Sequence, residues 1–204
     1  MNILAIGAHP DDIEFGCGGT LLKYRKKGAN IHLMVLTDGD LGGDNELRRQ
    51  EQIISSNILE VKDLFWGGYK DTQLPLDRKL IKTIEDVVYK VKPVFIFVNY
   101  FDDTHQDHHH LAKATMSATR YVKNVLFYEG PTTRNFSPNV FIEINDVLDD
   151  KIALLKAHAS QVMKTNIEDL SILEIAKSSA NFRGIQGRVK YAEGFVSLRL
   201  FINI

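Results

Sequence analysis

The chain has 204 residues, of which 44% are hydrophobic and 25% are charged, and its formal net charge is -1 at pH 7. These values are typical of one globular domain with a sizeable core, and they exclude the basic surplus with which nucleic-acid-binding proteins neutralise phosphates. A single cysteine, Cys17, excludes an internal disulfide and the cysteine-rich kinds of structural zinc site.

The N-terminal segment shows no basic-then-apolar signal pattern, and its apolar start at residues 2–8 is too short to cross a bilayer. We therefore expect a cytoplasmic protein that does not insert into a membrane.

Apolar runs of strand length alternate with amphipathic segments of helix length along the first hundred residues. The predicted strands are 2–8, 31–37, 63–66, 94–100, 125–128, 140–144 and 196–201. The predicted helices are 19–27, 46–59, 78–91, 109–122, 147–158 and 167–178. Such alternation favours a mostly parallel sheet built from right-handed crossovers. We predict an α/β fold, a three-layer Rossmann-like sheet with helices on both faces, forming a single domain over residues 1–204.

The first predicted strand, NILAIGA, runs directly into His9, Pro10, Asp11 and Asp12. Open α/β sheets bind ligands at the carboxyl ends of their strands. His9 and Asp12 are metal-ligand types, and Asp11 between them is free to handle protons. Alone, this tetrapeptide also fits a plain loop in which Asp12 caps the next helix.

A second polar cluster, DDTHQDHHH at 102–110, follows the predicted strand at 94–100. Two strand ends that carry histidine and aspartate favour a metal site. A hydrolytic zinc site commonly uses three protein ligands and leaves a fourth position for water, so the third ligand is expected from this cluster. His109 and His110 fit a solvated helix start.

Both clusters resemble the motifs of the LmbE-like (PIG-L-like) zinc-dependent N-deacetylases. This family includes N-acetylglucosaminyl-phosphatidylinositol de-N-acetylase and the deacetylases of mycothiol and bacillithiol synthesis. AHPDDIEFGCGGT matches the first family motif along its full length, and HQDH at 105–108 matches the second, usually written HPDH. The resemblance continues through TDGDLGGDNELRRQE, KAHASQ and YAEGF. Gln106 stands where the family usually has proline. The absence of the proline ring relaxes the backbone before His108.

The resemblance implies a role for each matched position. The implied metal ligands are His9, Asp12 and His108, with Zn2+ as the expected ion, although other divalent ions such as Fe2+ also suit such ligands. Asp11 is implied as the general base. His105 is implied as the group that stabilises the oxyanion, and Asp107 as the residue that orients it.

Three further residues are candidates for substrate binding. Arg48 holds the family's R-x-x-E position, which faces the substrate, but it also fits a surface ion pair with Glu51. Asp71 is suited either to sugar hydroxyls or to forming a turn. Arg134, in the loop 129–138, is available for an anionic aglycone.

The resemblance implies a metal-dependent hydrolase that removes the acetyl group from an N-acetylated amino sugar, a GlcNAc-type glycoside or conjugate, giving a free amine and acetate. The alternatives are a noncatalytic sugar or nucleotide binding module on the same fold, or a hydrolase of another amide or ester. A proton-handling carboxylate beside a metal favours an enzyme, and the G-x-G-x-x-G spacing of dinucleotide sites is missing.

The family often forms trimers or hexamers, so a homo-oligomer is also expected. The apolar C-terminal segment VSLRLFINI is predicted to lie at a sheet edge that a partner covers.

Overall fold

Seven strands form one central sheet in the computed structural model, which describes residues 1–202. The strand order is β3-β2-β1-β4-β5-β7-β6. Neighbours from β3 to β5 are parallel, and β7 is antiparallel to both of its neighbours. The strands are β1 (Asn2–Gly7), β2 (Asn30–Thr37), β3 (Asp63–Tyr69), β4 (Phe95–Asn99), β5 (Asn124–Tyr128), β6 (Val140–Glu143) and β7 (Ala192–Arg199). The prediction of a mostly parallel sheet is confirmed.

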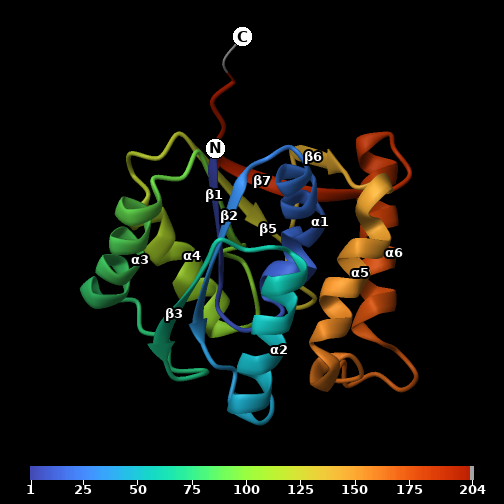
Figure 1. The fold of residues 1–204 in the computed structure, drawn as a ribbon, viewed down its shortest axis with the longest axis horizontal. Helices are drawn as coiled ribbons and strands as arrows, with labels where there is room; N and C mark the ends of the chain where they lie inside the picture. The colour runs from blue at the N-terminus through green and yellow to red at the C-terminus, as the bar shows by residue number, and fades with distance from the viewer. Residues whose placement is uncertain (203–204) are drawn as a thin grey trace.

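Helices cover both faces of the sheet (Figure 1). The helices α3 and α4 lie on one face, and α1 and α2 lie on the other, where α5 and α6 extend that layer. The helices are α1 (Asp12–Lys26), α2 (Asn45–Ile58), α3 (Arg78–Val91), α4 (Gln106–Ala118), α5 (Leu148–Ala157) and α6 (Ile172–Gly187), with short 3-10 turns η1 (Asn145–Val147) and η2 (Ala159–Gln161). The predicted three-layer Rossmann-like architecture is therefore correct.

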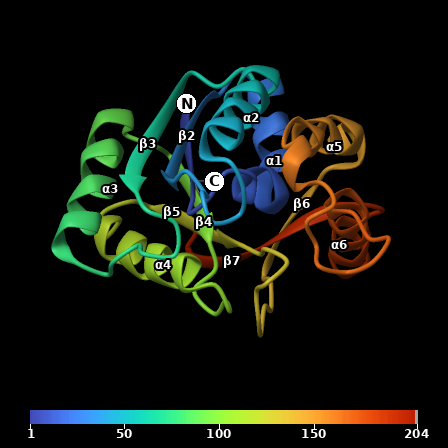
Figure 2. The same cartoon turned by 90° about the horizontal axis from the view of Figure 1, so that it is seen from below.

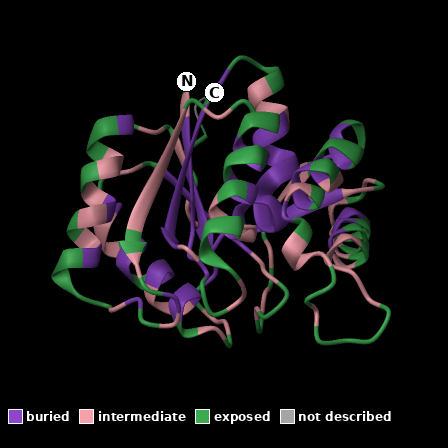
Figure 3. Ribbon diagram, turned by 60° about the horizontal axis from the view of Figure 1, so that its bottom comes forward, coloured by how far each residue is buried: buried purple, intermediate pink, exposed green. Residues whose placement is uncertain are grey.

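The two sides of each central strand supply two separate cores. On β1, Ile3 and Ala5 pack toward α1, while Leu4 and Ile6 pack toward α3 and α4. Side chains alternate along a strand, so a strand buried on both faces is apolar throughout. The central strands are accordingly buried along most of their length, as is the first half of α1 (Figure 3).

The chain order of the strands reverses at β1, which lies between β2 and β4. The crossovers that leave β1 and β4 pass to opposite faces of the sheet, so their loops diverge and leave a crevice at the carboxyl ends. Figure 2 looks onto this edge of the sheet. Both polar clusters found in the sequence, 9–12 and 102–110, follow these two strands.

Three helices begin at least three residues from the predicted start, among them α4, which begins at Gln106 rather than at 109. The first begins at Asp12 rather than at 19, because tertiary packing outweighs the low helix propensity of its glycines. A Cβ atom on Gly16 would lie 2.0 Å from Cδ2 of Tyr128, so the glycine permits close approach of helix and sheet. The last helix begins at Ile172 rather than at 167, after a capping box between Ser171 and Glu174.

The last strand, β7, is paired on both sides over only part of its length. Strand β6 pairs with residues 192–195 and β5 with residues 195–199, so residues 196–199 of the VSLRLFINI segment have a strand on one side only. The end of the VSLRLFINI segment, residues 203–204, lies outside the described residues. The predicted edge position therefore holds for residues 196–199, and the homo-oligomer that would cover it stays a prediction. Along residues 1–202, no helix combines the length and the apolar character needed to cross a membrane.

Candidate active site

The residues after β1 form a tight turn that leads into α1. The Asp12 N–H donates to the His9 carbonyl oxygen at 3.4 Å, and Asp11 has φ 87° and ψ −22°. With proline before it, a left-handed residue at this position defines a type II turn. Asp11 precedes the helix without a capping hydrogen bond from its side chain, and Asp12 is the first helical residue. The interpretation of Asp12 as a simple helix cap is therefore wrong.

Donor atoms of three residues from the two clusters meet at the crevice. His9 Nδ1 lies 3.3 Å from His108 Nε2 and 3.5 Å from an Asp12 carboxylate oxygen. The other Asp12 oxygen lies 3.3 Å from His108 Nε2. Ligand atoms about 2.0–2.1 Å from a tetrahedral zinc ion are separated from one another by about 3.3 Å. Each nearest pair of donor atoms lies close to this separation, and Asp12 contacts the two imidazoles through its two different oxygens.

Carboxylates hold the far sides of both imidazoles. His9 Nε2 lies 2.9 Å from Asp71 Oδ1 and 3.2 Å from Asp107 Oδ2, and His108 Nδ1 lies 3.2 Å from Asp103 Oδ2. Metal-binding histidines commonly have such partners, which fix the ring orientation and raise ligand basicity. His9, Asp71 and Asp107 also place three donor atoms within 4.8 Å of one another, but here the carboxylates serve as partners of the His9 ring.

Asp107 differs from its implied role. Its carboxylate contacts His9 and accepts hydrogen bonds from the N–H groups of Thr72 at 2.7 Å and Leu74 at 3.1 Å. Its hydrogen bond with His105 runs from the Asp107 backbone N–H to the imidazole Nδ1. The side chain of Asp107 therefore orients His9, and only its backbone orients His105.

His105 is positioned as a neutral hydrogen-bond donor. It caps α4, and its Nδ1 accepts from the Asp107 N–H at 3.2 Å, which leaves the ring proton on Nε2. Burial, together with the charges of His9 and His108, lowers the pKa of His105. A donor atom of His105 also lies within 4.8 Å of donors of His9 and His108. Because its Nδ1 is engaged, we treat His105 as a neighbour of the donor set rather than a member.

The replacement of proline by Gln106 leaves the start of α4 intact. Gln106 is the first residue of α4, a position that proline favours because no intrahelical acceptor exists for its N–H. The side chain of Gln106 instead donates to the carbonyl oxygen of Thr72 at 3.2 Å. The substitution therefore adds a link between α4 and the loop after β3.

The charges of the donor set are strongly coupled. Burial alone would lower the pKa of His108, but Asp12 and Asp103 outweigh it and raise this pKa to about 9. Burial likewise opposes the charged form of His9, yet its carboxylate neighbours raise the His9 pKa. Burial would raise the pKa of Asp12, whereas His108 and His9 hold it well below its usual range. The surrounding carboxylates therefore favour the protonated forms of both histidines.

Asp11 and Arg48 lie together beside the donor set. Burial raises the pKa of Asp11 to about 6, against the lowering effects of Arg48 and His158. Arg48 Nη2 lies 3.7 Å from Asp11 Oδ1, and the guanidinium also donates to the carbonyl oxygens of Gly39 at 2.7 Å and Pro10 at 2.8 Å. Arg48 is buried, so its interpretation as a surface ion pair is wrong. Glu51 instead accepts from the N–H and hydroxyl of Ser160.

A cavity of about 640 Å³ opens above these residues, a size typical of small-molecule sites. Arg48 and Asp71 line it, whereas Arg134 is exposed and lies outside its lining. The sequence did not indicate its outer wall, where Lys164 supplies a positive charge. The remaining lining residues are His9, Asp11, Asp12, Leu41, Gly42, Thr72, His105, His108, Pro131, Thr132, Gln161, Thr165, Asn166, Ile167, Ile172 and Ile175.

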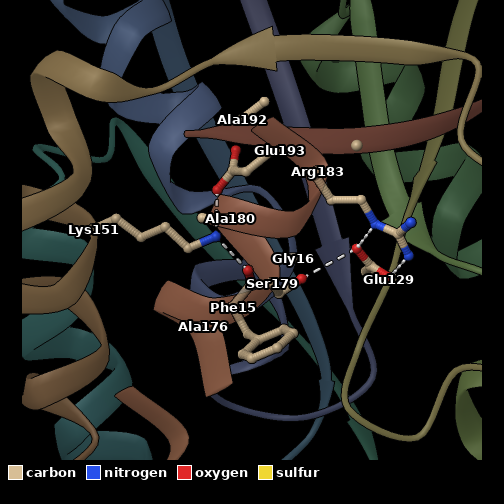
Figure 4. A pocket seen from close by; sticks show the side chains of 11 residues that line it. Phe15, Gly16, Glu129, Lys151, Ala176, Ser179, Ala180, Arg183, Ala192 and Glu193 are labelled. Atoms are coloured by element: carbon tan, nitrogen blue, oxygen red, sulfur yellow. Dashed lines mark hydrogen bonds and ion pairs between the residues drawn. The ribbon is translucent and has the colours of Figure 1, made fainter. Parts of the chain in front are cut away.

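A second cavity, between α1, α5, α6 and β7, holds a buried ion pair instead of a site (Figure 4). Its volume of about 10 Å³ is close to the minimum that admits one water molecule. Lys151 Nζ donates to Glu193 at 2.5 Å and to the Phe15 carbonyl oxygen at 2.6 Å. The Glu193 carboxylate also accepts from the N–H groups of Gly19 and Thr20. These contacts fasten α1, which carries Asp12, to α5 and β7.

Sequence reasoning missed two residues of the site. Asp103 lies in the second cluster, and its carboxylate two residues before His105 was the available signal. Gln52 is fully buried under the turn at residues 9–12, and a polar side chain on the buried face of α2 was the signal there.

The fold is a three-layer α/β fold, and a cluster of histidine and aspartate side chains that could hold a metal ion lies at its topological switch point. A family model described as GlcNAc-PI de-N-acetylase, PIG-L, matches residues 4–119. The chain is 35% identical over 167 residues to the uncharacterized deacetylase YaiS of Escherichia coli, covering 78% of this chain and 90% of that protein.

Two further proteins are similar to this chain over most of its length. Diacetylchitobiose deacetylase of Thermococcus kodakarensis is 28% identical over 227 residues, covering 94% of this chain and 81% of that protein. The crystal structure of the conserved protein TT1542 from Thermus thermophilus matches with a TM-score of 0.89 and 26% identity, covering 99% of this chain and 96% of that one. The chain belongs to the PIG-L, or LmbE-like, deacetylase family.

Proposed function

We propose that this protein removes the acetyl group from an N-acetylated amino sugar, a GlcNAc-type glycoside or conjugate, with the help of one divalent metal ion. The observation that carries the proposal is the meeting of His9, Asp12 and His108 at separations of 3.3 to 3.5 Å, next to Asp11, on the floor of a large cavity. We expect this ion to be zinc. Iron(II) is the main alternative, because ligand type selects imperfectly among divalent metals.

The bound ion would polarise the amide carbonyl and lower the pKa of a water molecule. Asp11 acts as the general base, because its carboxylate adjoins the donor set and takes no part in capping α1. With a pKa of about 6 it is mostly ionised at pH 7, so it can accept a proton from water and then donate it to the leaving amine.

His105 stabilises the negative charge that develops on the carbonyl oxygen. His105 lines the cavity, and its Nδ1 accepts from the Asp107 N–H, which leaves Nε2–H as the hydrogen-bond donor of the ring. A neutral imidazole is sufficient for this role. Asp107, Asp71 and Asp103 hold the rings of the two histidine ligands.

The proposed substrate contacts are Arg48, Asp71 and Arg134, which differ in their position relative to the cavity. Arg48 and Asp71 line the cavity and can meet sugar hydroxyls that approach the metal. Arg134 lies outside the cavity, so it meets only a part of the aglycone that projects beyond the rim. Within the cavity, Lys164 is better placed than Arg134 to meet an anionic group.

A noncatalytic sugar or nucleotide binding module remains the alternative from another class. A binding module needs no general base beside the donor set and no hydrogen-bond donor for a developing negative charge. Asp11 and His105 are suited to these two roles, which favours an enzyme. Hydrolysis of a different amide or of an ester uses the same groups, so substrate assays must separate these reactions.

The test is a panel of N-acetylglucosamine conjugates with neutral and anionic aglycones, assayed for free amine with metal-loaded protein. We expect about one catalytic divalent ion per chain and amine release from at least one conjugate. His108→Ala should abolish both metal binding and turnover, whereas the matched control His109→Ala, one residue along α4, should retain both. If His108→Ala keeps its metal content and its activity, the site assignment is wrong.

A further inference from the structure

We propose that Gln52 is a positioning residue for Asp11: from α2, it and Arg48 hold the Pro10–Asp11 peptide in the orientation that presents the Asp11 carboxylate to the donor set. The inference rests on the proposed function in so far as Asp11 is the general base. The contact itself is independent of that role.

Both polar atoms of this one peptide unit are bound by α2. Its carbonyl oxygen, on Pro10, accepts from Arg48 Nη2 at 2.8 Å, and its N–H, on Asp11, donates to Gln52 Oε1 at 3.4 Å. Arg48 and Gln52 are four residues apart, so their side chains lie on the same face of the helix. The C=O and N–H of a trans peptide point in opposite directions. The two side chains therefore hold the peptide plane from both ends.

The turn needs such a restraint because its geometry is strained. Asp11 has φ 87°, the conformation that position i+2 of a type II turn requires and that glycine favours. For other residues a left-handed backbone is strained. Rotation of the Pro10–Asp11 peptide converts the turn to type I, where the same residue has negative φ. That flip relieves the strain and re-aims the Asp11 side chain.

Glutamine is the side chain that fits this position. Gln52 Nε2 donates to Glu14 Oε1 at 2.7 Å, and the same carboxylate oxygen accepts from Ser55 Oγ at 2.8 Å. A carboxylate only accepts and a backbone N–H only donates, so an amide is needed to bridge them. The Glu14 contact therefore forces Oε1 of Gln52 toward the Asp11 N–H.

A change of Gln52 tests the positioning of Asp11 more directly than a change of Arg48 does. It is fully buried, and it does not line the cavity, whereas Arg48 does. A kinetic effect of changing Gln52 must therefore pass through another residue.

The variant Gln52→Met keeps the length of the side chain and removes both hydrogen bonds. We expect kcat to fall about 10- to 100-fold, the scale for a misplaced catalytic group, with KM and bound metal unchanged. The amide proton of Asp11, followed by NMR hydrogen exchange, should exchange faster. Two controls accompany it. Gln50→Met makes the same change on the exposed face of α2, and Leu59→Ala loosens the core packing at the end of that helix.

The results of these measurements distinguish a positioning role of Gln52 from a general structural role. A loss of kcat and faster Asp11 exchange in Gln52→Met alone supports the inference. Unchanged kcat overturns it, and so does a loss matched by Leu59→Ala at equal thermal stability, because general loosening would then explain both. If the wild-type protein deacetylates no sugar, the proposed function fails, and the Asp11 exchange rate alone decides whether Gln52 restrains the turn.

Discussion

Metal affinity should weaken steeply as the pH falls, because an ion must displace protons from buried imidazoles. Asp12 and Asp103 raise the pKa of His108 in the metal-free protein to about 9, although burial opposes this. A raised pKa means that the competing proton is present below pH 9 and absent above it. Each pH unit below the pKa then costs about 1.4 kcal/mol of binding free energy. From pH 9 to pH 7 the apparent Kd should therefore rise about 100-fold through His108 alone, and the raised pKa of His9 makes the dependence steeper.

The assay is competition between metal-stripped protein and a chelator of known affinity at several pH values between 7 and 9. Asp103→Asn is the informative variant, because it removes one of the two carboxylates that raise the His108 pKa. Its pH dependence should be shallower, and its affinity at pH 9 should be about 10- to 100-fold weaker through loss of the outer partner. Equal Kd values at pH 7 and pH 9 in the wild-type protein would refute the reasoning, since His108 would then be either neutral or not a ligand.

Asp11→Asn should lower kcat/KM at least about 100-fold with full metal occupancy, the usual scale for a lost general base. Near-normal turnover of the metal-loaded variant would remove Asp11 from that role. Lys151→Met should lower the free energy of unfolding by about 3 kcal/mol, because it leaves Glu193 as a buried unpaired charge. Lys23→Met, which breaks an exposed pair, should change it by no more than about 1 kcal/mol; urea titrations giving equal losses would contradict this difference. Light scattering should detect a homo-oligomer, and a monomer at micromolar concentration would end that expectation.

The sequence by itself determined the layered architecture and the location of the site. Apolar strands alternating with amphipathic helices allow few arrangements besides a parallel sheet covered on both faces. The carboxyl ends of parallel strands lie at the same end of the sheet. The sequence therefore placed His9 and Asp12 close to the polar cluster that follows the fourth strand. Element ends were less certain where packing decides them. The glycine-rich start of α1 has low helix propensity, and the close approach of Gly16 to Tyr128 and of Gly19 to Ile144 shows that tertiary packing decides its start.

Only the tertiary structure decided how the groups of the site are paired. Asp107 turned out to face His9, 98 residues away in the chain, and Gln52 lies under Asp11, 41 residues away. The wall that carries Lys164 belongs to a segment after α5, and β7 inserts between β5 and β6. Local sequence sets backbone propensity and which face of an element is apolar. It carries no signal for which side chains of two packed layers meet, because that depends on how the layers are aligned in space.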